Sequence, residues 1–511
     1  MRSSRPTKQH RLERGAKQAR AAAPDRSSEK FALHLLRRTT FGITPDLRAD
    51  VADAGGALAW LEQQFDPESI DDGTCSGALA AWPFATTDPQ VNHATMGAGN
   101  ATSMEDLVRA TLARQIWSRR QLFEVMVDFW SNHLNITCPS GTVWATKAWD
   151  DIHVVRANAL GRFEDMLQAS VTSPAMLLYL NNAQSRGDAV NENYARELLE
   201  LHTVGLGAGY QHRDIVNAAR ALSGLSVWDR SDKAAALSLG TFRYRAEWHY
   251  VGPVSVLGWS HPNGDAAGGV EVARSLIAYL ARHPSTAERI ARKLAVRFVR
   301  DHPSAALVRR LARVYLDSDT EIVPVLRALF TSDEFANAVG AKVRRPAEVV
   351  IAGWRALGAQ PIPGWLNRNN AVAQLRWTLS EMGNAPLGWP LPDGYPDVAA
   401  AWKGAGLTLT AWNAHLTAAT HRLNNGVLWP DLATHLLDGA VPTSWDGLVD
   451  TLTARLLPGQ RVSPAHRAAF LAFLADAAGA ADPGALRPQD LKALLPVLVA
   501  LVLDSPYWSV R

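Results

Sequence analysis

Apolar residues recur at helical spacing along most of this 511-residue chain, and this periodicity restricts the fold more than any other feature. A repeat of three to four residues places apolar side chains on one face of a helix. The chain lacks the regular alternation of strands and helices that a parallel sheet requires, and it has no internal repeat of fixed period. We therefore expect a mainly α protein, built as a large helical bundle or array.

The expected helices begin near Ser28 and continue to the end of the chain, with irregular regions at 67–103, 225–262 and 358–402 between them. A loop is expected at 67–103, which is rich in Gly, Ala, Thr, Asp and Asn. Short strands, and with them a small β-hairpin insertion, are expected within 225–262. The expected helical segments outside these regions are 28–41, 46–66, 105–134, 149–170, 174–181, 190–204, 211–224, 270–283, 285–300, 304–316, 321–338, 345–357 and parts of 401–511.

These patterns divide the chain into six parts. They are a disordered basic tail (1–28), an N-terminal helical part with the candidate site (29–224), an insertion with short strands (225–269), a second helical part (270–357), an irregular segment rich in Trp, Pro and Gly (358–402) and a C-terminal helical part (403–511).

The charge of the chain is unevenly distributed. Residues 1–30 contain nine of the 52 Lys and Arg residues but only three of the 49 Asp and Glu residues, so the remainder is mildly acidic. An acidic body does not indicate a nucleic-acid groove, and we expect no nucleic-acid partner. Cys75 and Cys138 are the only cysteines, which indicates free thiols and a reducing compartment. No apolar run is long enough to cross a membrane, and the basic N-terminus lacks the apolar segment of a signal peptide, so we expect a cytoplasmic protein.

One expected helix, Phe123–Leu134, is apolar almost all the way round and should therefore be buried. Asp128 and Asn132 are four residues apart and share one of its faces. A buried carboxylate is unstable without a partner, so Asp128 requires an Arg, a His, a metal ion or a ring of N–H groups. His133 lies well round the helix from this pair, unless the helix has already ended there.

A second helix, Asn191–Gly205, carries a polar stripe made of Asn193, Arg196, Glu197 and Glu200. If His133 approached Glu197 and Glu200, the three side chains could hold a divalent metal ion, which is the one cofactor that the sequence suggests. The alternative is a polar seam without chemistry, in which Arg196 pairs with Glu200 or with Asp128.

The loop that precedes this helix is dense in amide and guanidinium groups. Asn182, Gln184 and Arg186 could hold an anion at the start of the helix. The alternative is a turn whose side chains satisfy its own backbone.

No standard catalytic motif is present, so the candidate residues define the functional hypotheses. The first is an enzyme, a metal-assisted hydrolase or lyase acting on a polar or anionic substrate. In it, Asp128, His133, Glu197 and Glu200 are the catalytic candidates, and Asn182, Gln184, Arg186, Asn193 and Arg196 are the binding candidates. Glu197 or Glu200 would act as base or metal ligand, and His133 as ligand or acid.

Two other hypotheses remain open. With eighteen Trp residues in the chain, the irregular segment 358–402 could form a cleft that binds a protein or a glycan without catalysis. Its candidate residues are Trp365, Trp377, Trp389 and Trp402. The other is a helical cyclase or synthase that uses a diphosphate, with Asp150 and Asp151 facing Asn193 and Glu197 across a cavity.

Several stretches of the chain resemble the bacterial family called domain of unknown function 1800. They include His34–Gly42, Asp128–His133, Ala159–Phe163, Pro174–Gly205, Gly209-Tyr210, Asp214–Val216, His283–Ala287, Arg297–Val299, Gly394–Pro396 and Trp402. The resemblance covers roughly residues 30 to 420 and implies a helical protein from a bacterium, with no assigned reaction. Tyr250 and Val254 depart from the His-Asp and Lys pattern of the family, and many relatives are exported.

Overall fold

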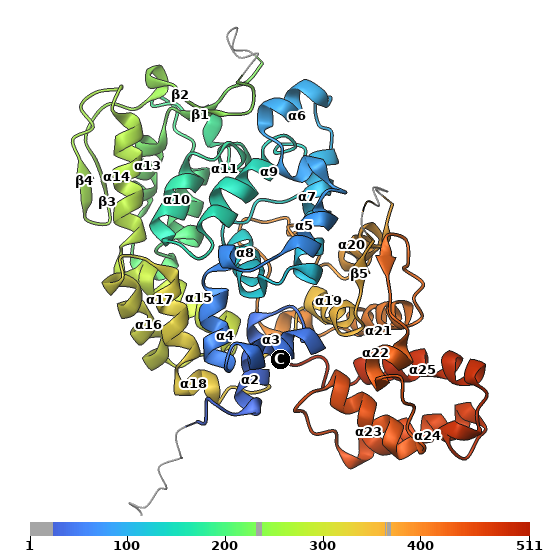
Figure 1. The fold of residues 1–511 in the computed structure, drawn as a ribbon. Coiled ribbons are helices and arrows are strands. Elements are labelled where there is room, and N and C mark those ends of the chain that lie inside the picture. The colour runs from blue at the N-terminus through green and yellow to red at the C-terminus, as the bar shows by residue number, and fades with distance from the viewer. Residues whose placement is uncertain (1–23, 231–237, 363, 365–368) are drawn as a thin grey trace, which may run out of the picture.

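The computed structural model describes residues 24–230, 238–362, 364 and 369–511, and helices dominate it (Figure 1). The mainly α class is confirmed. The first helix, α2 (Glu29–Thr39), starts where the sequence indicates, because the Ser28 hydroxyl accepts a hydrogen bond from the Phe31 N–H. Most of the expected basic tail lies outside the described residues.

The segment expected as a loop at 67–103 is instead a series of short helical turns. Three of them begin with proline at the first helical position, and Cys75, Trp82 and Ala85 anchor them in the core. None of these turns buries more than two side chains, so no long periodic pattern marks them. The elements that follow α2 are α3 (Pro45–Asp53), α4 (Ala57–Gln64), η1 (Pro67–Ser69), α5 (Gly73–Leu79), η2 (Pro83–Thr86) and α6 (Pro89–Thr95).

The expected long helix 105–134 is two helices, α7 (Thr102–Trp117) and α8 (Gln121–His133). Between them the Gln121 amide donates to the Ser118 carbonyl oxygen over 2.8 Å, and its own oxygen accepts from the Phe41 N–H over 2.9 Å. The first bond satisfies a carbonyl group that the break leaves free, and the second ties the break to the segment that follows α2. The helix that carries Asp128 and His133 is therefore short, and it ends at His133.

Two π-helical turns interrupt the middle of the chain, η3 (Asp151–Arg156) and η5 (Leu198–His202). Such turns change the phase of the side chains that follow and are frequent at functional sites. The other elements here are α9 (Lys147–Asp150), α10 (Phe163–Val171), α11 (Pro174–Tyr179), η4 (Asn182–Gln184), α12 (Asn193–Glu197), η6 (Leu206–Ala208) and α13 (His212–Leu222).

The expected insertion of short strands contains two antiparallel pairs. Strand β1 (Leu225–Val227) pairs with β2 (Phe242–Tyr244), and β3 (Val254–Val256) pairs with β4 (Trp259–His261). The turn η7 (Ala246–Trp248) connects the two pairs. In Figure 1, β3 and β4 lie along one edge of the molecule beside α13 and α14 (Gly269–Ala281), and β1 packs against α11.

The second half of the chain is helical again, including α20 (Ala371–Glu381), which lies in the segment expected to be irregular. The last helices form a group at one side of the molecule (Figure 1). None of the helices in the described residues is both long and apolar enough to cross a membrane. The elements are α15 (Pro284–Phe298), α16 (Ala305–Asp317), α17 (Ile322–Phe330), α18 (Asp333–Ala336), α19 (Pro346–Ala356), β5 (Gln360–Pro361), η8 (Ala399–Trp402), α21 (Ala405–Ala419), β6 (Val427–Leu428), α22 (Leu432–Leu437), α23 (Trp445–Leu456), α24 (Pro464–Ala478), η9 (Pro483–Ala485) and α25 (Pro488–Leu503).

Candidate functional site

A cavity of about 420 Å³ lies between α8, α15 and the segment 389–397. This volume is that of a small-molecule site. One part of its wall is apolar, and the other carries more basic than acidic side chains. The basic residues are Arg292, Lys293, Arg297 and Arg345, the acidic ones are Asp128, Asp393 and Asp397, and the apolar ones include Phe129, Val296, Trp389 and Tyr395.

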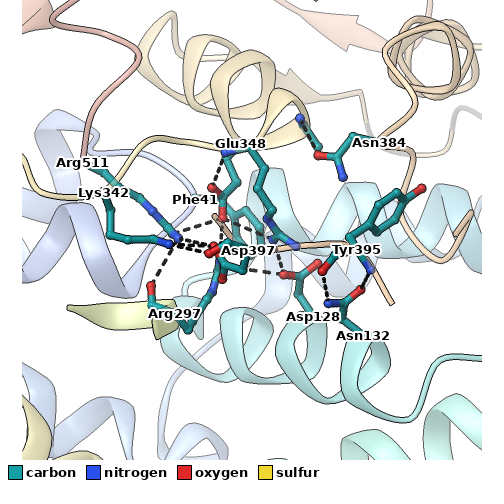
Figure 2. Close-up of polar contacts among 12 residues, drawn as sticks. Phe41, Asp128, Asn132, Arg297, Lys342, Glu348, Asn384, Tyr395, Asp397 and Arg511 are labelled. Atoms are coloured by element: carbon teal, nitrogen blue, oxygen red, sulfur yellow. Dashed lines mark hydrogen bonds and ion pairs between the residues drawn. The ribbon is translucent and has the colours of Figure 1, made fainter. Parts of the chain in front are cut away.

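A reciprocal pair of hydrogen bonds holds the segment 389–397 against α8. The Asn132 oxygen accepts from the Tyr395 N–H over 2.6 Å, and the Asn132 amide donates to the Tyr395 carbonyl oxygen over 2.8 Å (Figure 2). Gly394 has φ +74°, and a Cβ atom there would overlap the Asn132 carbonyl oxygen. The glycine therefore allows the backbone approach that closes this side of the cavity.

Lys293, on the cavity wall, is hydrogen-bonded to a buried histidine. Its Nζ atom lies 2.9 Å from Nδ1 of His133, and Nε2 of His133 lies 3.0 Å from the carbonyl oxygen of His202. A carbonyl oxygen can only accept, so Nε2 of His133 carries the imidazole proton. Nδ1 is consequently the acceptor, and Lys293 is the donor. This chain of bonds orients the lysine nitrogen at the cavity wall.

The carbonyl that orients His133 belongs to the end of the π-helical turn η5. The last carbonyl groups of a helix have no partner within it. Here Arg289 donates to the Leu201 carbonyl over 3.1 Å, and the Gly205 N–H donates to the Leu199 carbonyl over 2.8 Å. Nε2 of His133 donates to the His202 carbonyl. The same helix end thus positions both His133, which contacts Lys293, and Arg289, which acts on it electrostatically.

The surroundings of Lys293 favour its neutral amine. Burial, and next the charge of Arg289, lower its pKa to about 7, against the opposing effect of Asp393 and Asp397. Within the described part of the chain, no carboxylate oxygen lies at ion-pair distance from Nζ. Burial, with the neighbouring charge of Lys293, also holds the pKa of His133 well below its usual range, so this imidazole is neutral.

A buried ionic network forms the floor beside Lys293 (Figure 2). Asp128 accepts from Arg345 over 2.5 Å and lies 3.6 Å from Arg297, which pairs with Glu348 over 2.5 Å. Arg297 is only 2% exposed, yet its Nε and Nη2 atoms have no hydrogen-bond partner among the described residues, and neither does Nε of Arg345. Buried donors without partners are rare and indicate a site for a water molecule or a ligand. The network also contains Lys342, Asp397, Asp301 and Arg511.

The structure places Asp128 and Asn132 on the same face of α8, as expected, and both line the cavity. The carboxylate of Asp128 is already held by Arg345, so its partner is an arginine. His133 lies behind the cavity wall, not on it, because both ring nitrogens are engaged by Lys293 and His202.

Glu197 and Glu200 are half-buried and close enough to interact electrostatically. Burial, and next the charge of Glu200, raise the pKa of Glu197, and Asp393 on the cavity wall raises it further. A carboxyl group with a raised pKa holds its proton more readily than an ordinary glutamate does. Glu197 therefore remains a candidate acid or base near Asp393.

The expected metal set of His133, Glu197 and Glu200 does not form. Within residues 24–230, 238–362, 364 and 369–511, no group of three or more His, Cys, Asp or Glu side chains could hold a metal ion. The physical reason lies in His133, because Nε2 donates to a carbonyl and Nδ1 accepts from Lys293, so no lone pair is free for a ligand bond.

The candidate binding residues of the loop and of α12 do not converge on the cavity. Asn182 is buried and donates to the Leu222 and Leu225 carbonyls, as a structural turn would. Arg186 is exposed and lies over Trp248, 4.7 Å from the ring centre, and Gln184 is also exposed. None of these three lines the cavity.

On α12 itself, Asn193 is exposed and donates to the Leu180 carbonyl over 3.3 Å. The pairing expected between Arg196 and Glu200 or Asp128 is wrong. Arg196 pairs instead with Glu192 over 3.0 Å, because the glutamate lies one helical turn earlier.

The residues of the two other hypotheses are dispersed. Asp150 is buried and held by Lys147 and Ser173, each over 2.6 Å, so it does not face a metal ion with Asp151. Trp365 lies outside the described residues, and Trp377 is 62% exposed. Trp389 and Trp402 both pack against the ring of Tyr395, and of these two only Trp389 lines the Lys293 cavity. The described tryptophans among these candidates therefore do not line one common cleft.

A second cavity, of about 800 Å³, lies near α3, α5 and α22. It is larger than the Lys293 cavity, but several of its charged groups are already paired with one another. Arg119 pairs with Asp50 over 2.8 Å and donates its N–H to Asp72 over 2.7 Å, and Arg455 pairs with Asp438 over 2.5 Å. The Lys293 cavity is the better candidate for an active site because its amine lacks such a partner.

The sequence analysis did not identify Lys293 and Arg297 as candidate site residues. Arg289, Lys293 and Arg297 are spaced four residues apart on α15 and so form a basic stripe on a helix whose other face is apolar. The last member directly precedes Phe298-Val299 and is buried. A basic residue inside an apolar run is the feature that could have identified this stripe.

Comparison with known proteins places the chain beside one family. A family model described as a protein of unknown function, DUF1800, matches residues 34–510, which is further than the 30–420 indicated by individual motifs. No curated protein and no solved structure matches the chain.

Proposed function

This chain belongs to the DUF1800 family of proteins of unknown function, and we propose that it is an enzyme acting on a small polar or anionic substrate in the Lys293 cavity. Lys293 is the general base or nucleophile, in a hydrolase or lyase reaction in which an amine takes the place of the metal ion that the sequence suggests. The observation that carries this proposal is the 2.9 Å contact between Nζ of Lys293, at the cavity wall, and the neutral, buried His133 behind it.

The chemical argument rests on what that contact does. An amine attacks or removes a proton only when it is neutral, and an ordinary lysine is almost wholly protonated at pH 7. Burial, next to the charge of Arg289, lowers the pKa of Lys293 to about 7, so a large fraction of the amine is neutral there. His133 accepts one N–H, so the lone pair points elsewhere.

The surrounding groups fit a polar substrate. Arg292 and Arg297 bring positive charge to the wall, and Phe129 and Trp389 supply an apolar surface. Glu197, whose pKa is raised, would supply or remove the second proton of an acid–base reaction.

The test combines labelling with turnover. At pH 7, an acylating reagent should modify Lys293 faster than the exposed Lys492, as peptide mapping can measure. A panel of small carboxylic esters, amides and carbonyl acids should then contain a compound that is consumed by the wild-type protein. Lys293→Ala should abolish that consumption, and the matched Lys492→Ala should leave it unchanged. Consumption that persists in Lys293→Ala, or equal acylation of both lysines at pH 7, would overturn the proposal.

A further inference from the structure

We infer that the substrate is a small 2-oxo acid, whose carbonyl carbon forms a Schiff base with Lys293 while its carboxylate is held by Arg297 and Arg345. This inference rests on the proposed function and names the substrate class of the same site. It joins two features that are otherwise separate, an amine at the cavity wall and buried guanidinium donors without partners.

The first feature is the placement of the amine. Lys293 Nζ is half-buried and is held by one hydrogen bond to His133, which leaves the rest of the nitrogen free to react. The groups that interact with it are His133, Arg289, Asp393 and Asp397. A lysine that is desolvated beside another cation is a general arrangement for amine attack on a carbonyl carbon.

The second feature is the set of donors one helical turn away. Arg297 follows Lys293 by four residues on α15, so both lie on the same face. Arg297 Nε and Nη2 and Arg345 Nε have no hydrogen-bond partner among the described residues, although the two side chains are 2% and 5% exposed. Planar guanidinium groups match the two oxygens of a carboxylate.

The charge of the wall agrees with an anion of this size. Four basic and three acidic side chains line the cavity, so one positive charge is not balanced within it when the nitrogen of Lys293 is cationic, as it is in the iminium ion formed with a substrate. A monoanionic substrate would balance that charge. The Cβ atoms of helical positions i and i+4 lie about 6 Å apart. The side chains of Lys293 and Arg297 can therefore reach the same small molecule, one whose carbonyl and carboxylate carbons are adjacent.

The proposed step balances without an added oxidant or reductant. The neutral Lys293 amine attacks the carbonyl carbon, and the C=O π electrons move to oxygen. One N–H proton is transferred to that oxygen, and a carboxyl group protonates the resulting hydroxyl, which leaves as water. The product is an iminium ion between Nζ and the substrate carbon. We assign Glu197, which interacts electrostatically with Asp393 on the cavity wall, as the proton donor.

The experiment traps the iminium with borohydride. The full-length protein is incubated with pyruvate at pH 7, reduced and mapped by mass spectrometry. We expect a stable secondary amine on Lys293 and none on Lys492. Acetone and pyruvamide, which lack the carboxylate, should label Lys293 about ten- to a hundredfold more slowly, the loss expected for charge-assisted hydrogen bonds. This comparison uses only the wild-type protein, so it does not depend on the folding of a variant.

The outcomes separate this inference from the proposed function. If Lys293 is selectively acylated at pH 7 but pyruvate gives no adduct, or if acetone labels it as fast as pyruvate, the 2-oxo acid assignment is wrong while the reactive amine remains. If Lys293 is not selectively acylated at all, both proposals fail. Arg297→Lys, which keeps the charge but loses the planar donors, should slow labelling by pyruvate more than labelling by acetone.

Discussion

The Nζ atom of Lys293 lies 2.9 Å from Nδ1 of His133, and this pair joins two helices that are 160 residues apart in the sequence. The histidine is neutral and its proton is on the other nitrogen, so the lysine is the donor. A buried lysine bonded to a neutral imidazole, and not to a carboxylate, loses much of its tendency to hold a proton. The stability and reactivity of the protein should both depend on this pair.

Replacing Lys293 by Met should change how stability depends on pH. The pKa of Lys293 is about 7 in the folded chain and 10.5 in the reference state, so between these values the unfolded chain binds more protons. Wild-type stability should therefore rise from pH 7 to pH 10, and the full penalty of the buried charge should act below pH 7. The free energy of unfolding of Lys293→Met should exceed that of the wild type by roughly 1–3 kcal/mol at pH 6, and the difference should shrink or reverse by pH 10.

Urea denaturation at pH 6, 8 and 10 measures this difference, with Lys492→Met as the exposed control. A difference between Lys293→Met and the wild type that stays constant with pH would show that Lys293 keeps an ordinary pKa.

Replacing His133 by Phe should destabilise the protein by about 1–3 kcal/mol, because the His202 carbonyl loses its donor while the ring volume is nearly kept. The matched control is His153→Phe. His153 is exposed, so this change should stay within about 0.5 kcal/mol. Thermal and urea unfolding compare the two, and equal effects would contradict the role given to His133.

Gly394→Ala should disrupt the cavity wall. The new Cβ would overlap the Asn132 carbonyl oxygen, and φ is +74°. Gly439→Ala is a close control, because its φ is +75° but nothing lies within 4 Å of the added carbon. The control should lose about 1 kcal/mol from backbone strain alone, and Gly394→Ala several kcal/mol or its folding. Similar losses in both variants would show that the segment 389–397 is not held against α8.

Much of the fold could be predicted from the sequence, but only part of the site. The apolar surroundings of Phe123–Leu134 predict a buried helix, and the spacing of Asp128 and Asn132 predicts their shared face. The partner of Asp128 is Arg345, more than 200 residues away, which no local pattern reveals. The π-helical turn Leu198–His202 shifts the side-chain phase that a regular helix would give, so the position of His202 could not be derived.

Breaking the ionic network at Arg345 should cost about 3–5 kcal/mol, because Arg345→Met leaves the carboxylates of Asp128 and Glu348 without this partner. The double variant Asp128→Leu/Arg345→Met should lose less than the single variant, because it removes a buried charge together with its partner. Arg467→Met breaks an exposed pair and should change stability much less than Arg345→Met does. If the double variant loses as much stability as Asp128→Leu and Arg345→Met lose when added together, this coupling is contradicted.

The most direct test is the titration of the Lys293 amine by NMR. In protein labelled with ¹³C at lysine, the Cε resonance of Lys293 is assigned by its absence in Lys293→Arg and followed from pH 5 to 11. A midpoint near 7 is expected, which would identify an amine that can react at neutral pH. A midpoint near 10.5, the value of an ordinary lysine, would contradict the account.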